Sequence, residues 1–215
     1  MLSLYHSPNS RSSRIIWLCE ELEVDYQIVY CSILRGIGLG ARDPANPHPD
    51  KRVPALVHDG ALVTESAAIA LYLTDLMPSM GLGPGPGMPS RGEYISWLAY
   101  YAGEAEPAFA AKLSGRTEVD PIAAVAFDRV IRRVFLALEA GDYLLGESFS
   151  AADILFASLF QWHRDLAPES DDLDAWLERL AVRPAAQRAT EKDILSSANP
   201  IADAINARRS GDGDK

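Results

Sequence analysis

The first part of the chain changes its hydrophobic pattern every few residues. Residues 2–5 alternate between apolar and polar positions, as a short strand does. Residues 14–22 place apolar side chains at helical spacing, and residues 26–30 predict a second strand. Because a strand, a helix and a strand follow one another within about 30 residues, we expect the two strands to pair in parallel.

A second group of elements follows a loop over residues 35–52 that is rich in Gly, Pro, Asn and Asp. Residues 54–57 and 61–63 predict two strands joined by a tight turn. Residues 64–76 return to helical spacing. The first part of the chain therefore predicts the order β-α-β, then β-β-α.

The pattern changes again after a segment dense in Gly and Pro. This segment cannot hold a regular element and is the natural linker. Helical periodicity then dominates over residues 90–114, 120–140, 151–164 and 172–189, and residues 207–215 are polar enough to fray. We predict an α/β domain over residues 1–78, a linker over 79–89 and an all-helical domain over 90–215.

Composition and charge exclude some classes of function but do not identify one. Hydrophobic residues make up 48% and charged residues 23%, which is typical of a soluble globular protein. The formal net charge of -10 argues against binding to nucleic acid or to an anionic membrane. The first residues lack the pattern of a signal peptide, no apolar run approaches the roughly 18 residues that span a bilayer, and there is no Cys-x-x-Cys pattern, so we expect a cytoplasmic protein without a signal peptide.

A serine-rich segment, Ser7-Pro8-Asn9-Ser10-Arg11-Ser12-Ser13-Arg14, lies where the first strand passes into the first helix. A helix N-terminus offers unpaired N–H groups and a positive dipole, and both favour an anion. A serine hydroxyl placed there could donate a hydrogen bond to a thiolate. The alternative is that these serines only cap the helix.

Two further segments have the same kind of ambiguity. Pro54 opens a strand after a long loop. If the bond between Val53 and Pro54 is cis, it would turn the Val53 backbone outward to pair with an extended peptide. If the bond is trans, Pro54 would only begin an edge strand. Glu65 and Ser66 stand at the start of a helix. They could hold the ammonium and carboxylate of an amino acid, or serve as a first-turn acid and a cap.

The segment from Phe149 to Ile154 predicts a helix start. Ser150 and Asp153 have the spacing of a reciprocal capping box, and Phe149 is placed to pack on Ile154 as a hydrophobic staple. We expect this segment to nucleate a buried helix and to have no catalytic role.

In their order and spacing these segments resemble the cytosolic glutathione transferases of the serine type. The resemblance covers nearly the whole chain and is carried by Ser10-Arg11-Ser12-Ser13-Arg14, Val53-Pro54-Ala55-Leu56, Glu65-Ser66-Ala67-Ala68-Ile69 and the stretch from Leu144 to Ile154. It implies a thioredoxin-like α/β domain followed by an all-α domain, a homodimer, and glutathione as co-substrate without a metal. The implied activity is conjugation of glutathione to a hydrophobic electrophile in detoxification, with the electrophile pocket in the helical domain.

The resemblance also implies roles for individual residues. Ser10 would donate to the glutathione thiolate, with Asn9 and Ser12 as alternatives. Val53 would pair its backbone with the cysteinyl unit, and Glu65 with Ser66 would hold the γ-glutamyl unit. The candidates for binding the glycyl carboxylate are Arg52, Lys51 and His48. They lie in the loop before Val53, which is longer than in the commoner family form.

Other interpretations remain at this point. The polar cluster around Asn9 would also suit a glutathione-dependent disulfide reductase or peroxidase, and the fold could serve as a non-catalytic binding or interaction protein. Residues 36–41 fit a loose dinucleotide fingerprint, but no helix follows the glycines, so a loop is expected. The four histidines lack metal-ligand spacing, and no metal site is predicted.

Overall fold

The structure, a computed structural model, describes residues 1–35, 38 and 40–194. It divides into two compact units, one formed by residues 1–69 with the segment from Pro184, the other by residues 70–183. Of the loose dinucleotide fingerprint, Gly36, Ile37 and Leu39 lie outside the described residues, as do residues 195–215 at the end of the range predicted as helical domain.

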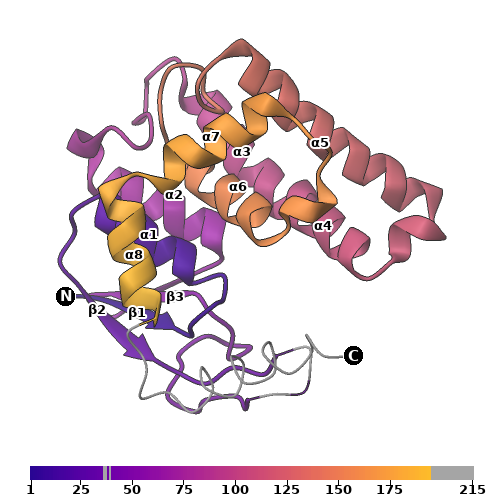
Figure 1. The fold of residues 1–215 in the computed structure, drawn as a ribbon. Coiled ribbons are helices and arrows are strands. Elements are labelled where there is room, and N and C mark those ends of the chain that lie inside the picture. The colour runs from indigo at the N-terminus through magenta and orange to yellow at the C-terminus, as the bar shows by residue number, and fades with distance from the viewer. Residues whose placement is uncertain (36–37, 39, 195–215) are drawn as a thin grey trace. The chain divides into compact units, whose positions relative to one another are not determined.

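The first unit is built on a four-stranded sheet with the order β2-β1-β3-β4. Three of these strands, β1, β2 and β3, are labelled in Figure 1. The strands are β1 (Leu2–His6), β2 (Tyr26–Tyr30), β3 (Ala55–His58) and β4 (Ala61–Thr64). β1 pairs in parallel with β2 and antiparallel with β3, which pairs antiparallel with β4. The predicted strand order along the chain and the parallel first pair are confirmed.

Helix α8 (Pro184–Ile194) packs against α1 (Ser13–Glu21), although the two are far apart in the sequence. Glu20 of α1 joins them: it accepts a hydrogen bond from Arg188 at 3.0 Å and pairs with Lys192, while Tyr26 donates to it at 2.8 Å. Burial opposes ionisation of Glu20, but these hydrogen bonds outweigh it and lower its pKa. The predicted boundary at residues 79–89 stays a prediction; α8 is described with the first unit because its contacts are made there.

The second unit is helical throughout its regular elements, as predicted. After α2 (Ser66–Leu76), which crosses from one unit to the other, come α3 (Arg91–Tyr100), α4 (Glu106–Leu113), α5 (Pro121–Ala140), α6 (Ala151–Trp162) and α7 (Asp171–Ala181). Its core is aromatic: Phe109, Phe156, Phe160 and Trp176 are all buried within it. Helix α5 fits the predicted range of 120–140, because Asp120 caps it through its side chain and Pro121 is its first residue.

The prolines Pro107 and Pro184 affect two of the predicted helices differently. Residues 91–113 stay helical through a π-helical turn at Tyr101–Ala105 between α3 and α4, and the backbone of Glu106, just before Pro107, remains right-handed helical. Residues 172–189 do not form one helix: α7 ends at Ala181 and α8 begins at Pro184. A proline lacks the N–H of the helical ladder, so it is accepted at the first position of a helix, as in α8.

The predicted capping box of α6 is present. Ser150 and Asp153 cap each other reciprocally, and Asp153 is completely buried. Its carboxylate also accepts hydrogen bonds from the Leu144 N–H at 2.9 Å and the Trp176 indole at 3.1 Å. The carboxylate therefore fixes the preceding turn and α7 as well as the helix start.

Candidate functional site

The serine-rich turn between β1 and α1 is held by its own hydroxyl groups. Ser10 Oγ donates to the Ser7 carbonyl at 2.6 Å and lies 2.7 Å from Ser12 Oγ. Ser12 stands at the N-cap position of α1, yet its side chain makes no capping hydrogen bond. The Ser12 hydroxyl therefore does not cap the helix, and both hydroxyls instead hold the turn.

The three candidates for the thiol contact differ in exposure. Ser12 is completely buried, whereas Ser10 is half-buried and Asn9 is exposed. Asn9 has a φ of 51°, and its backbone N–H donates to Asp193 at 3.1 Å. Ser10 is therefore the hydroxyl that a ligand can reach, and Ser12 lies behind it.

Two residues that sequence reasoning did not single out lie beneath this turn. His6, at the end of β1, is completely buried; its Nδ1 is 2.8 Å from Ser12 Oγ, and its Nε2 is 3.2 Å from Asp193 Oδ1. Asp193 comes from α8 and also accepts a hydrogen bond from Ser13 Oγ at 2.6 Å. No sequence signal places Asp193 here, because only the packing of α8 on α1 brings it to β1.

Burial raises the pKa of the Asp193 carboxyl, but hydrogen bonds from His6, Ser13 and the Asn9 backbone more than offset this. The net effect is a lowered pKa, so the carboxylate is ionised at neutral pH. A cation also lies beside the turn: Arg35 donates to Ser7 Oγ at 3.1 Å and to the Asn9 carbonyl at 3.0 Å. The turn is thus held by an anion from α8 and by a cation from the loop after β2.

The register of the sheet gathers the predicted segments at one edge. Tyr5 of β1 faces Ala55 of β3, and Ala55 faces Thr64 of β4. The residues next to these positions are Pro54, Glu65 and the turn that begins at Ser7. Because neighbouring strands are about 4.8 Å apart, the three segments leave the sheet side by side.

The two remaining segments of this edge have unusual backbone conformations. The bond between Val53 and Pro54 is cis, one of the two alternatives that the sequence left open, and Val53 is buried just outside the strand ladder. Glu65 is exposed with a φ of 70°, and its carbonyl accepts the Ile69 N–H at 2.9 Å, which makes it the N-cap of α2. A glutamate in left-handed backbone is strained, and such strain is found preferentially at functional sites.

The loop before Val53 uses two of its three candidate side chains internally. Buried His48 accepts the Asp50 N–H on Nδ1 at 3.0 Å, and Lys51 Nζ donates to the Asn46 carbonyl at 2.7 Å. Arg52 is exposed. Of the three, Arg52 is the one best placed to meet a carboxylate without breaking the loop's own hydrogen bonds.

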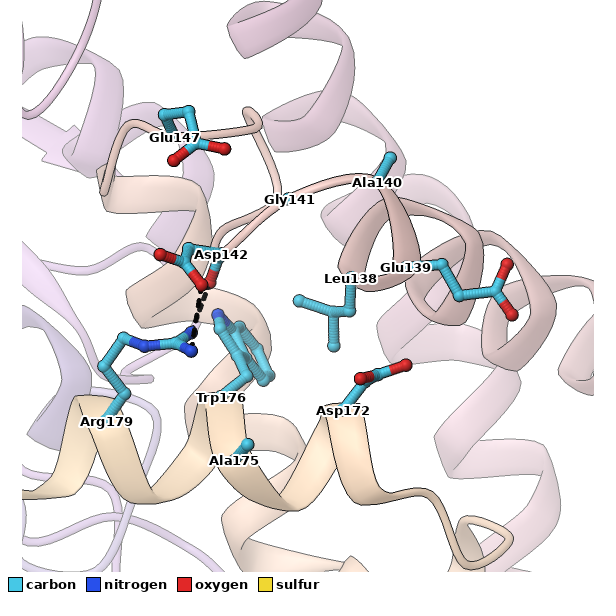
Figure 2. A pocket seen from close by; sticks show the side chains of 10 residues that line it. All are labelled: Leu138, Glu139, Ala140, Gly141, Asp142, Glu147, Asp172, Ala175, Trp176 and Arg179. Atoms are coloured by element: carbon cyan, nitrogen blue, oxygen red, sulfur yellow. Dashed lines mark hydrogen bonds and ion pairs between the residues drawn. The ribbon is translucent and has the colours of Figure 1, made fainter.

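A separate pocket of about 310 Å³ lies in the helical unit, between the end of α5 and α7 (Figure 2). Glu139, Asp142, Glu147 and Asp172 line it, and Arg179 forms an ion pair with Asp142 at 3.0 Å. None of the predicted site residues borders it. Four carboxylates do not suit a hydrophobic electrophile, so we do not place the electrophile there.

In the described part of the chain, no three His, Cys, Asp or Glu residues are grouped so that they could hold a metal ion. No helix among the described residues is long and apolar enough to span a bilayer. Both cysteines are buried and free, and burial raises the pKa of Cys31 to about 11, which does not favour a reactive thiolate.

Comparison with known proteins identifies the family. Residues 4–83 match the glutathione S-transferase N-terminal domain, and residues 99–184 match the C-terminal domain. The chain is 27% identical over 200 residues to glutathione S-transferase GstA of Escherichia coli O157:H7, covering 90% of this chain and all of the relative. It is 26% identical over 215 residues to the disulfide-bond oxidoreductase YfcG of E. coli K12, covering 91% and 97%.

Among solved structures, a sphingomonad glutathione S-transferase complexed with glutathione superposes with a TM-score of 0.76 at 27% identity, covering 90% of this chain and all of the other. The predicted fold class, a thioredoxin-like α/β domain followed by an all-α domain, is confirmed. The chain belongs to the glutathione S-transferase family.

Proposed function

We propose that this protein is a glutathione transferase that conjugates the thiolate of glutathione to a hydrophobic electrophile. One observation carries the proposal: the half-buried Ser10 hydroxyl stands at a helix start on the sheet edge shared with cis-Pro54 and the Glu65–Ser66 pair. That edge combines a donor for a thiolate with groups suited to an extended peptide. Glutathione is the co-substrate, and the reaction requires no metal.

The task of Ser10 is to make the thiol of glutathione acidic. A free thiol with a pKa near 8.5 is only a few per cent ionised at neutral pH. A charge-assisted hydrogen bond contributes about 1.5–3 kcal/mol, and one pKa unit corresponds to about 1.36 kcal/mol. Donation from Ser10 would therefore lower the pKa of the bound thiol by about 1–2 units.

The rest of the edge would hold the peptide. Val53 lies outside the strand ladder, and we assign its backbone to the cysteinyl unit. Glu65 and Ser66 would take the ammonium and carboxylate of the γ-glutamyl unit at the start of α2. Arg52 would meet the glycyl carboxylate, with Lys51 and His48 as the alternatives from the same loop.

Three wider parts of the proposal follow from the family. The electrophile would bind against the helical domain, the protein would form a homodimer, and it would work in the cytoplasm, where glutathione is available. Light scattering of the purified protein tests the dimer, because a monomeric mass at micromolar concentration would contradict it.

The catalytic assignment is tested by comparing wild type with Ser10→Ala, Ser12→Ala and Asn9→Ala. The pKa of bound glutathione is read from the ultraviolet absorbance of its thiolate, and the conjugation rate is measured with an activated aryl halide. We expect Ser10→Ala to raise the thiol pKa by about 1–2 units and to slow conjugation roughly ten- to a hundredfold at neutral pH. An unchanged pKa in Ser10→Ala would move the role to Ser12, Asn9 or the helix N-terminus.

A second candidate is glutathione-dependent reduction of disulfides, favoured by the likeness to the disulfide-bond oxidoreductase YfcG. In that case Asn9 would position the sulfur, and the protein would reduce a mixed disulfide at the same rate with or without the Ser10 hydroxyl. Binding of glutathione with no turnover of electrophiles or disulfides would indicate a non-catalytic binding protein instead.

A further inference from the structure

Four polar side chains form a continuous line beneath the surface of the serine-rich turn. It runs from half-buried Ser10 to buried Ser12 (2.7 Å), from Ser12 to His6 Nδ1 (2.8 Å) and from His6 Nε2 to Asp193 (3.2 Å). One end opens where the thiol is proposed to bind, and the other ends on a carboxylate. A buried imidazole between a carboxylate and a hydroxyl is the arrangement that enzymes use to hold and move a proton.

The hydrogen bonds of the Ser12 hydroxyl restrict the direction in which the protons along this line point. Its oxygen accepts the Ser7 N–H at 3.2 Å, which uses one of its two lone pairs. Its proton has a longer contact to the Ser7 carbonyl at 3.4 Å, and the shorter contacts with Ser10 and His6 share one proton and one lone pair. When that proton lies on the line, Ser12 donates to one of these two neighbours and accepts from the other, so the protons along the line all point the same way.

Two arrangements satisfy this condition. In the first, Ser10 donates to Ser12, and Ser12 donates to a neutral His6 whose Nε2–H faces Asp193. In the second, every proton is reversed and His6 carries protons on both nitrogens, as an imidazolium beside the carboxylate. The Ser7 carbonyl, 2.6 Å from Ser10 Oγ, accepts the Ser10 proton in the second arrangement, where Ser10 Oγ accepts from Ser12. For His6 to receive a proton, glutathione has to meet the line in the first arrangement, with His6 neutral and the Ser10 proton turned to Ser12.

We propose that His6, held and charge-balanced by Asp193, receives the proton that leaves the thiol of glutathione, passed on through Ser10 and Ser12. This inference rests on the proposed function. The thiol S–H bond breaks and its electron pair stays on sulfur. Ser10 Oγ takes that proton and gives its own to Ser12 Oγ, which gives its own to His6 Nδ1.

The products of this transfer fit both ends of the line. The thiolate now accepts a hydrogen bond from the proton that Ser10 has just taken, and the imidazolium lies against the Asp193 carboxylate. When the sulfur lone pair forms the bond to carbon and the leaving group departs with its electron pair, the His6 proton returns along the same line to Ser10 and to solvent. The sum is glutathione plus electrophile giving conjugate plus the protonated leaving group.

Two described residues from other elements contact the His6 ring. Asp193 faces it from α8, and the ring of Tyr30 from β2 packs edge-on at 5.5 Å between centroids. Cys31 contacts only the His6 carbonyl, through its backbone N–H and its Sγ. Arg35 lies by Ser7. Asp193 is thus the anion in direct contact with the imidazole, and it is the group that would stabilise the charged form.

The experiment counts protons and thiolates in the same samples. Glutathione binding is followed by calorimetry in buffers of different ionisation enthalpy, which gives the protons released, and by ultraviolet absorbance, which gives the thiolate formed. We expect the wild type to release close to no proton for each thiolate formed. Release of one proton per thiolate would overturn the relay and leave the proposed function intact, whereas binding without a thiolate would overturn both.

Variants separate a relay from a structural role. Asp193→Asn and His6→Gln should lower kcat/KM about a hundredfold, and any thiolate that they still form should release its proton to solvent. S-methylglutathione, which has no thiol proton, should bind these variants as it binds wild type. The matched control is Arg188→Gln, which weakens the docking of α8 on α1 without touching the line. Equal loss of activity in Arg188→Gln would show that Asp193 only docks the helix.

Discussion

The Asp153 carboxylate offers a sharp test of what holds the helical unit together. It is completely buried at the start of α6 and accepts four hydrogen bonds. Oδ1 takes the Leu144 N–H and the Trp176 indole, and Oδ2 takes the Ser150 N–H at 2.9 Å and the Ser150 hydroxyl at 3.0 Å. Two variants divide these bonds: Asp153→Ala removes all of them, and Asp153→Asn keeps the oxygen at one side only.

The size of the effect follows from the donors left behind. The Ser150 hydroxyl can rotate to another acceptor, but two backbone N–H groups and the indole cannot. A buried donor without a partner costs about 1–3 kcal/mol, and Asp153→Ala leaves three such donors behind. We therefore expect Asp153→Ala to lower the free energy of unfolding by about 3–5 kcal/mol. Asp153→Asn, which sets an amide N–H against the Ser150 N–H, should lower it by about 1–3 kcal/mol.

Urea unfolding followed by circular dichroism and tryptophan fluorescence measures both variants. Trp176→Phe removes a single donor, and its combination with Asp153→Ala in a double-mutant cycle should reveal a coupling of about 1 kcal/mol. Asp172→Ala is the control, because this aspartate is exposed in the first turn of α7. The reasoning is refuted if Asp153→Ala unfolds within the error of the control.

Three other predictions concern the first unit and the segment after α2. Glu20→Gln should lower the free energy of unfolding by about 1 kcal/mol above pH 5. Since the folded state lowers the Glu20 pKa, the difference between the variant and wild type should vanish as the pH falls through that pKa. Urea titrations at several pH values would detect this. Glu65→Gly should relieve the φ of 70° and leave stability unchanged or up to about 1 kcal/mol higher, yet weaken glutathione binding about tenfold or more in calorimetry; unchanged affinity would remove Glu65 from the site. Gly83→Ala should lower the melting temperature, at a cost of about 1–3 kcal/mol, because its Cβ would lie 2.8 Å from Thr74 and 2.9 Å from Tyr94, whereas Gly85→Ala meets no atom within 4 Å and should melt as wild type.

The elements that the sequence predicted well are those decided by local pattern. Alternation over residues 2–5 and apolar spacing over residues 14–22 are properties of neighbouring residues, and β1 and α1 formed within one residue of the expected ends. The capping box at Ser150 and Asp153 depends on a spacing of three residues, so it could also be predicted from the sequence. Where one proline outweighs a periodic pattern, as at Pro184, the periodicity alone predicted one helix and the structure has two.

The candidate site could be predicted in part because its segments share an edge that the strand order dictates. Once β1, β3 and β4 pair as they do, the turn after β1, the residue before β3 and the residue after β4 must meet. The internal use of His48 and Lys51 by their own loop was not predictable, because it depends on backbone positions such as the Asn46 carbonyl. Sequence pattern shows which residue types are present but not which hydrogen bonds already occupy them.

The line through His6 shows the limit most clearly, and it also suggests how this fold assembles its chemistry. His6 ends an ordinary strand and Asp193 lies in an ordinary amphipathic helix, so neither stands out until α8 packs on α1. The same carboxylate then takes the Asn9 N–H and the Ser13 hydroxyl, which shape the turn that presents Ser10, while it balances the imidazole below. The strands and the serines come from the first part of the chain, whereas the carboxylate that faces the imidazole comes from the last described helix.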